Sequence, residues 1–328
     1  MFKFGNIEIN SKVILAPMAG VTSYGYRKFV SQFKPGYMVT EMVSDMGLIY
    51  GNEETKKYVC FDRLEIPTGV QLFGNCPKNM AKAALICENL NPNIDFYDIN
   101  MGCPVPKVTN SGAGSALMKN PRLCGDIVRT LKTVTDKPVT AKIRLGWDNN
   151  SLNYLEVIKE LEKAGVDMIG IHARTRKELY CGSPHYELLK DLRKQMSVPL
   201  SVSGNIYSLD DAIHAIDITG ADSVMVARGG VGNPFLVKQI NEYYKTGERL
   251  ESPSLKEQLI WCEELAKRIV EEKGEYTGMR VYRSIAPKFF SGIRNIKKYR
   301  LRLTTELETL DSLNQILKEI AEDNGIEF

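Results

Sequence analysis

Short runs of β-branched and other apolar residues alternate with longer segments of helical periodicity along most of the chain. A strand buried on both faces gives a short continuous apolar run, whereas an amphipathic helix repeats apolar residues every three or four positions. We therefore expect eight strands, at Val13–Ala16, Tyr37–Thr40, Thr68–Gln71, Asp95–Asn100, Val139–Ile143, Met168–His172, Leu200–Ser203 and Ser223–Ala227. Helical patterns lie between them, at Pro77–Asn89, Pro121–Thr133, Leu152–Ala164 and Leu209–Thr219.

The ends of these segments carry residues that favour helix termini, with Ser151 a candidate N-cap before Leu152 and Gly165 and Gly220 candidate C-terminal stops. Strands that alternate with helices form parallel sheets. Eight such units in roughly 240 residues fit a (β/α)8 TIM barrel better than an open sheet. The open dinucleotide-binding sheet is the alternative, and the lack of Gly-x-Gly-x-x-Gly after the first strand weakens it.

The strand pattern stops after Tyr244, where a polar turn and a linker follow, and the linker ends at Ser254, a candidate N-cap. Helical patterns then occupy residues near 254–273, 276–292 and 304–322, and we expect Pro287 to break the middle one. The sequence therefore predicts a barrel domain of residues 1–245 and an all-α helical-bundle domain of residues 246–328.

The composition, with 43% apolar and 25% charged residues, is that of an ordinary globular protein. No apolar run approaches the ~18 residues of a transmembrane helix, and the first residues lack the apolar core of a signal peptide. We expect a cytoplasmic protein that does not bind membranes. The seven cysteines include no Cys-x-x-Cys pair, which argues against a disulfide framework and against a metal site.

Positive charge is concentrated in residues 280–302, although the formal net charge is only +3. The basic residues of this stretch, which contains no acidic residue, are Arg280, Arg283, Lys288, Arg294, Lys297, Lys298, Arg300 and Arg302. Tyr282, Phe289, Phe290 and Tyr299 alternate with them. Either the stretch contacts RNA through phosphate contacts and stacking, or it is a solvated basic helix with its aromatic residues in the core.

Polar residues stand at the expected carboxyl ends of the strands, the face that carries the active site in this type of barrel. The loops Ser203-Gly204-Asn205 and Ala227-Arg228-Gly229-Gly230 combine backbone N–H groups with a guanidinium, which indicates a phosphate site. Lys142 could stabilise a reduced flavin or form a Schiff base. His172, at the end of the sixth strand, is a further candidate.

Cys103 ends the segment Asp98-Ile99-Asn100-Met101-Gly102-Cys103, directly after an expected strand. A thiol at this point could be a nucleophile, which needs a nearby base, or a general acid. An ordinary cysteine, with a pKa of about 8.5, already satisfies the second role at neutral pH. The residues alone do not choose between the two.

These segments resemble the tRNA-dihydrouridine synthase family. The matching segments are Ala16-Pro17-Met18-Ala19-Gly20-Val21-Thr22, Gln71-Leu72-Phe73-Gly74, Asp98–Lys107, Lys142-Ile143-Arg144-Leu145-Gly146, His172–Arg176 with Tyr180-Cys181-Gly182, and Met225–Pro234. The resemblance implies an FMN-dependent enzyme that uses NADPH to reduce the C5–C6 double bond of particular uridines in tRNA. It also implies that Cys103 gives a proton to C5 while reduced FMN gives a hydride to C6.

The resemblance assigns further residues by position. It implies cofactor contacts by Pro17, Met18, Ala19, Gln71, Lys142, His172, Ser203, Gly204, Asn205, Ala227 and Arg228. It implies substrate contacts by Asn100, Arg144, Arg174, Lys297 and Lys298, and favours RNA as the partner of the basic stretch. The family commonly has Asn-Gly-Asp at residues 203–205 and Gly-Arg at residues 227–228, so this chain departs from it there.

Two other functions remain open on the residues alone. A flavin barrel could reduce a free pyrimidine, as a dihydroorotate dehydrogenase-like enzyme does, but a small substrate needs no extended basic surface. A non-catalytic RNA-binding protein would not need Cys103, Lys142 and His172 together. We expect a monomer that binds tRNA and no metal.

Overall fold

Eight parallel strands form the centre of the molecule, in a computed structural model that describes all residues, Met1–Phe328. They are β3 (Val13–Leu15), β4 (Met38–Val39), β6 (Thr68–Phe73), β7 (Phe96–Asn100), β8 (Val139–Arg144), β9 (Met168–His172), β10 (Leu200–Ser203) and β11 (Ser223–Val226). Each strand pairs in parallel with the next, and β11 pairs back with β3, so the sheet closes. The expected TIM barrel and its eight strands are confirmed.

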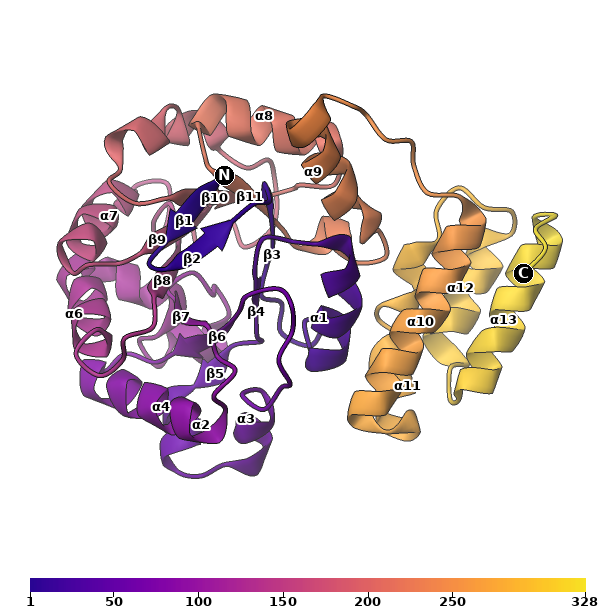
Figure 1. The fold of residues 1–328 in the computed structure, drawn as a ribbon, viewed down its shortest axis with the longest axis horizontal. Coiled ribbons are helices and arrows are strands. Elements are labelled where there is room, and N and C mark those ends of the chain that lie inside the picture. Colours follow the sequence, from indigo (N-terminus) through magenta and orange to yellow (C-terminus); the bar gives the residue numbers. More distant parts are fainter. The chain divides into compact units, whose positions relative to one another are not determined.

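Helices follow the barrel strands and surround them (Figure 1). The longer ones are α4 (Pro77–Leu90), α6 (Pro121–Leu131), α7 (Tyr154–Lys163) and α8 (Leu209–Thr219). Shorter elements of the barrel are β5 (Val43–Ser44), α2 (Asp45–Ile49), α3 (Glu53–Lys57), α5 (Pro106–Thr109) and the 3-10 turns η2 (Gly114–Lys119), η3 (Tyr186–Leu189) and η4 (Leu192–Gln195). The expected cap at Ser151 is wrong: α7 begins after Asn153, because Leu152 forms a β-bridge with Gly146.

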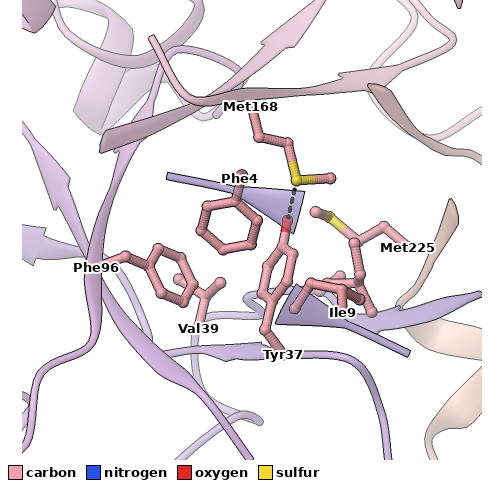
Figure 2. Close-up of a cluster of buried hydrophobic side chains, with 9 residues drawn as sticks. Phe4, Ile9, Tyr37, Val39, Phe96, Met168 and Met225 are labelled. Carbon is pink, nitrogen blue, oxygen red and sulfur yellow. Dashed lines mark hydrogen bonds between the residues drawn. The ribbon is translucent and has the colours of Figure 1, made fainter. Parts of the chain in front are cut away.

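A hairpin that the sequence analysis missed, β1 (Phe2–Phe4) and β2 (Ile7–Ile9), contributes to an apolar cluster at the amino end of the barrel (Figure 2). The ring of Phe4 packs edge-on against Tyr37 at 5.3 Å and Phe96 at 5.2 Å between centroids. Gly69 leaves room for this cluster, because a Cβ there would lie 2.4 Å from the Phe96 ring. Apolar packing thus fills the amino end and leaves the carboxyl end for chemistry.

The chain divides into two compact units, and the second comprises residues 19–34 and 228–328. Its helices are α1 (Tyr24–Val30), α9 (Phe235–Thr246), α10 (Leu255–Lys273), α11 (Glu275–Tyr282), α12 (Ile296–Thr305) and α13 (Leu310–Asp323), with the 3-10 turns η1 (Ser31–Phe33), η5 (Arg228–Gly230) and η6 (Ala286–Phe289). This division follows packing rather than chain order, so the predicted domain boundary after residue 245 stays a prediction.

Three predicted helix boundaries in the second unit can be compared with those in the structure. Ser254 caps α10 in a capping box with Glu257, as expected. The expected helix at 276–292 breaks after Tyr282, and a 3-10 turn contains Pro287. The expected helix at 304–322 is wrong at its start: α12 ends at Thr305, and Thr309 caps a new helix, α13.

The aromatic residues of the basic stretch lie in the core of the helical unit. Tyr282, Phe289, Phe290 and Tyr299 are at most 3% exposed. The hydroxyl of Tyr282 donates to the carbonyl of Cys262 at 2.6 Å, and that of Tyr299 donates to the Asp323 carboxylate at 2.5 Å. The expectation that these rings stack on bases is therefore wrong, because packing between helices buries them.

Helix α1 packs closely on α10 within the same unit. The Glu272 carboxylate accepts hydrogen bonds from the Ser23 hydroxyl at 2.6 Å and the Gly25 amide at 2.8 Å. A Cβ at Gly25 would lie 2.5 Å from the carbonyl oxygen of Arg268, so only glycine permits this approach. Glu272 thus supplies the acceptors that the first turn of α1 needs.

The cluster at the amino end predicts a large effect of one substitution. Phe4→Ala should lower the free energy of unfolding by about 3–5 kcal/mol, because it removes a buried ring and leaves a cavity. Urea unfolding followed by circular dichroism measures the change. Lys3→Ala, at the exposed position of the same strand, is the control and should cost much less. Equal losses for the two variants would contradict the packing described.

Candidate active site

The register of the strands arranges polar side chains in layers at the carboxyl half of the barrel. Gln71 pairs with Asp98, and Asp98 pairs with Thr140, across β6, β7 and β8. One layer nearer the carboxyl end, Asn100 of β7 pairs with Lys142 of β8. Alternate residues of a strand point to the same side, so both layers face the barrel interior.

A chain of hydrogen bonds joins the two layers. The Asp98 carboxylate accepts from the Thr140 hydroxyl and from Gln71 Nε2, both at 2.6 Å. Gln71 Oε1 accepts from Asn100 Nδ2 at 2.8 Å. Asn100 Oδ1 in turn accepts from the backbone amide of Cys103 at 2.9 Å. A buried carboxylate is thereby connected to the loop that carries the candidate thiol.

Several contacts hold the backbone around Cys103. Arg144 Nε donates to the Gly102 carbonyl at 2.7 Å, and Asn100 Oδ1 accepts from the Gly102 amide at 3.2 Å. The Cys103 carbonyl accepts from the amide of Ser115 at 3.1 Å and from its hydroxyl at 2.9 Å. The half-buried thiol itself makes no hydrogen bond with any side chain. The backbone is fixed while the sulfur remains available.

Lys142 is a half-buried ammonium without a hydrogen-bond or ion-pair partner. The pKa of Lys142 is lowered to about 8, chiefly by burial and also by the charge of Arg144, and interactions with Asp98 and Cys103 partly oppose the shift. An unpartnered amine of this kind is suited to an electron-rich group brought by a ligand.

Arg144 and Arg174, which the family resemblance suggests as substrate ligands, are at most 2% exposed and bind backbone carbonyls. Arg144 Nη1 donates to the carbonyls of Thr175 and Leu179, both at 2.8 Å. Arg174 donates to the carbonyls of Cys181 at 2.9 Å and Gly182 at 2.5 Å. These contacts hold the loop after β9, so their observed role is structural; the substrate role stays a prediction.

His172 lies between Arg174 and Ser203 at the ends of β9 and β10. Arg174 Nη1 lies 3.2 Å from His172 Nε2, and a guanidinium can only donate, so Nε2 must accept. The proton is therefore on Nδ1, which lies 3.4 Å from the Ser203 hydroxyl oxygen. The imidazole thus presents an N–H group on the side of Ser203.

The loop after β10 contains two successive residues of positive φ. Gly204 has φ +142° and Asn205 has φ +48°, and a Cβ at Gly204 would lie 2.8 Å from the Pro184 side chain. Successive residues of unusual φ can direct their N–H groups to one side. The capping box of Ser208 and Asp211 already occupies the first turn of α8, so an anion here would depend on residues 203–205.

The remaining predicted residues lie in different parts of the molecule. Pro17 and Met18 are half-buried after β3, and Ala227 follows β11. Ala19 and Arg228 belong to the helical unit, as do Lys297 and Lys298, which are exposed on α12. Gln71 is 1% exposed, with both ends of its amide already bonded, so it offers less to a cofactor than Lys142 does.

Three residues near the candidate site, Asp98, Thr140 and Tyr180, were given no role from the sequence. Asp98 and Thr140 stand mid-strand among apolar neighbours, and that alternation was the available signal. Tyr180 is 49% exposed, lies 5.3 Å from the Arg144 guanidinium and meets His172 edge-on at 6.1 Å. Because it lies on a loop, no periodic pattern predicts its position.

The residues of the barrel fit a flavin. The unpartnered Lys142 ammonium would hold the carbonyl edge of the ring, and the turn at residues 203–205 with His172 offers N–H donors to a phosphate. When bound, this cofactor would supply a hydride. No group of three or more His, Cys, Asp or Glu side chains is arranged to hold a metal ion, and no helix is both long and apolar enough to span a membrane.

The fold and the site define a TIM barrel that carries its polar residues at the carboxyl end. Similar barrels occur in an old yellow enzyme homologue from Zymomonas mobilis (TM-score 0.52, 12% identity, 78% of this chain and 94% of that one). A 2-naphthoyl-CoA reductase in complex with 2-naphthoyl-CoA is also similar (TM-score 0.60, 11% identity, 99% of this chain and 69% of that one). At these identities the likeness concerns the fold alone.

The sequence profile of the family described as "Dihydrouridine synthase (Dus)" matches residues 14–324, and the chain belongs to this family of enzymes. A probable tRNA-dihydrouridine synthase of Rickettsia conorii is 36% identical over 92% of this chain and 90% of its own length. tRNA-dihydrouridine synthase B of Pseudomonas aeruginosa is 33% identical over 94% of this chain and 92% of its own. Membership favours the flavin role of Lys142 over a Schiff base.

The pKa of Lys142 has a consequence for stability. Below about pH 8 the amine is charged in both states, and the folded protein carries the cost of burying that charge. Between about pH 8 and its ordinary pKa of 10.5, only the unfolded chain still binds the proton. The contribution of this residue to the free energy of unfolding therefore becomes more favourable as pH rises through that range.

Lys142→Met should accordingly stabilise the ligand-free protein at pH 7, and its advantage over the unsubstituted protein should shrink toward pH 10. Urea unfolding at the two pH values measures this difference. Lys107→Met, at an exposed lysine, is the control and should change the free energy of unfolding by less than about 0.5 kcal/mol at either pH. An advantage of Lys142→Met that does not vary with pH would contradict the lowered pKa.

Proposed function

We propose that this protein reduces the C5–C6 double bond of uridines in tRNA to 5,6-dihydrouridine, with FMN as cofactor and NADPH as electron donor. One observation carries the proposal: a thiol and an unpartnered ammonium, Cys103 and Lys142, stand at the ends of adjacent barrel strands. The relatives named tRNA-dihydrouridine synthase support tRNA as the substrate. Family membership makes a free pyrimidine the less suitable alternative.

Cys103 acts as the general acid in this proposal. A nucleophilic cysteine needs a base to take its proton, and no side chain makes a hydrogen bond with the Cys103 thiol. The thiol gives its proton from Sγ to C5 when the reduced flavin gives a hydride to C6 of the uracil ring. Asn100, Arg144 and Ser115 fix the backbone of the loop, which keeps the sulfur in one place during this transfer.

The cofactor is held by the barrel end in this proposal. The Lys142 ammonium binds the carbonyl edge of the flavin and stabilises the negative charge of its reduced form. Residues 203–205, His172 and Arg228 bind the phosphate. Pro17, Met18 and Ala19 supply contacts to the ring. Since Ser203 and Asn205 differ from the common family residues, the phosphate contacts here come from backbone N–H groups.

The helical unit binds the RNA in this proposal. Five cations between residues 288 and 300 are exposed: Lys288, Arg294, Lys297, Lys298 and Arg300. Of these, Lys298 lies 3.6 Å from the Glu319 carboxylate and Arg300 donates to the Phe290 carbonyl at 3.2 Å. Arg283 instead donates to the Leu307 carbonyl at 2.9 Å, and Arg302 is paired with Glu306 and Glu319. Because the aromatic rings nearby are buried, the contact is with phosphates rather than with bases. The target uridine must leave its stack to reach the barrel.

Cys103→Ala should retain bound flavin and lose tRNA reduction by about 100- to 10,000-fold, because general acids typically contribute this factor. Mass spectrometry of dihydrouridine in tRNA incubated with protein, FMN and NADPH measures the loss. Cys60→Ala, at an exposed cysteine, is the matched control and should react at the original rate. Normal turnover by Cys103→Ala would remove the proton-donor role, and protein that binds no FMN would remove the flavin role.

Lys297→Glu with Lys298→Glu should weaken tRNA binding and reduce its dependence on salt concentration. Each phosphate contact releases counterions when the complex forms, so a complex with fewer contacts releases fewer of them. Filter binding across a salt series measures both quantities. The control changes another pair of adjacent lysines, Lys56 and Lys57 of α3 in the barrel unit, to glutamate, which makes the change in charge equal. Equal weakening by both pairs would point to net charge rather than to α12 as the cause.

A further inference from the structure

Hydrogen bonds link Asp98, Gln71, Asn100 and the Cys103 amide in series, and Asp98 determines which group donates and which accepts at each step. An ionised carboxylate can only accept hydrogen bonds, whereas a side-chain amide donates at its nitrogen and accepts at its oxygen. Asp98 accepts from Gln71 Nε2, which turns Gln71 Oε1 toward Asn100. Asn100 must then donate to Gln71, which turns Asn100 Oδ1 toward the amides of Gly102 and Cys103.

We propose that Asp98 is a positioning residue for Cys103, which fixes the orientation of two amide groups and so secures the acceptor that holds the Cys103 backbone. Asp98 is 4% exposed and lies one layer below Asn100 and Lys142, so it acts through other residues. The catalytic meaning of this role rests on the proposed function. The claim that Asp98 orients the Cys103 backbone rests on the hydrogen bonds alone.

The surroundings of Asp98 hold the carboxylate in a single arrangement. The Thr140 hydroxyl donates to one oxygen at 2.6 Å, and Gln71 donates to the other at 2.6 Å. The pKa of Asp98 is raised, chiefly by burial, and the bonds from Thr140 and Gln71 and the charge of Lys142 oppose the rise only in part. Both oxygens accept hydrogen bonds, as those of a carboxylate do. A buried carboxylate is costly to retain for stability alone, since a nonpolar replacement is often neutral or stabilising.

Reversing the two amides is unfavourable only while Asp98 is a carboxylate. Turning Gln71 over would place its oxygen against the Asp98 oxygen, and a buried polar atom without its partner costs about 1–3 kcal/mol. In Asp98→Asn the new side chain can donate, so Gln71 can turn and present Nε2 to Asn100. Asn100 would then turn its own nitrogen toward the Cys103 amide. Both groups are donors, so the hydrogen bond between Cys103 and Asn100 would be lost.

The test measures hydrogen exchange of the Cys103 amide in the full-length, FMN-loaded protein. Asp98→Asn should raise its exchange rate by about 10-fold or more, equivalent to about 1.4 kcal/mol, within the range for a lost buried hydrogen bond. Its kcat for tRNA reduction should fall by about 10- to 100-fold, with flavin content and NADPH oxidation within about twofold. Unchanged Cys103 exchange in folded Asp98→Asn would overturn the proposal, whatever the activity.

The matched control is Asp167→Asn. The Asp167 carboxylate lies just before β9, near the amino end of the barrel, and accepts from Lys132 and from the Val139 amide at 2.7 Å. Its loss should lower stability and leave both Cys103 exchange and kcat unchanged. An equal rise in Cys103 exchange in this variant would show a general loosening of the barrel and would also overturn the proposal.

A double-mutant cycle separates action through Asn100 from a general effect. Asn100→Ala removes the acceptor directly, so adding Asp98→Asn should raise Cys103 exchange no further. Additive effects of the two changes would overturn the proposal. Should Asp98→Asn fail to fold, Gln71→Met cuts the chain between Asp98 and Asn100 and should raise Cys103 exchange likewise, and an unchanged rate there would count against the proposal.

The two proposals fail separately. Full tRNA reduction by Cys103→Ala would remove the general acid and leave the exchange result for Asp98 intact. Conversely, unchanged exchange in Asp98→Asn together with an inactive Cys103→Ala would remove the positioning role and keep the acid.

Discussion

The peptide that joins Gly102 to Cys103 is held from two sides by side chains of neighbouring strands, and the proposed proton transfer depends on this restraint. Asn100 of β7 binds both amide groups, and Arg144 of β8 binds the Gly102 carbonyl. A loop normally moves more than the strands that carry it. These contacts give the Cys103 backbone the rigidity of the strands and leave the sulfur without a bond. A proton donor needs this combination of fixed position and free reactive atom.

The same region contains charged side chains that are costly to bury. Asp98, Arg144 and Arg174 are buried, and Lys142 is half-buried without a partner. The amino end of the barrel is instead filled by the apolar cluster of Phe4, Tyr37 and Phe96 (Figure 2). Apolar packing thus stabilises the amino end of the barrel, whereas burial of charged groups lowers the stability of the carboxyl end. Such a division is common in enzymes of this fold, in which the carboxyl end serves chemistry.

Much of the fold could be predicted from the chain. All eight barrel strands lie where the apolar runs predicted them, because strands buried on both faces have an unambiguous local pattern. The β1–β2 hairpin was missed although Phe2–Ile9 alternates apolar and polar residues around Gly5-Asn6. Helix α12 was also missed, because its basic residues suggested a surface and hid its helical period. The buried rings of Tyr282 and Tyr299 show that a local mixture of basic and aromatic residues does not reveal which of them face solvent.

The sequence by itself determined the barrel, the helical segments that follow it, the family and the position of Cys103 at a strand end. Each of these depends on local periodicity or on a contiguous motif. Only the tertiary structure decided what the polar residues contact. Gln71, Asp98 and Thr140 come from three strands far apart in the chain, and their contact depends on the register of parallel strands, which no local pattern encodes. For the same reason Arg144 and Arg174, suggested as substrate ligands by position, lie against backbone carbonyls of loops that folding brings to them.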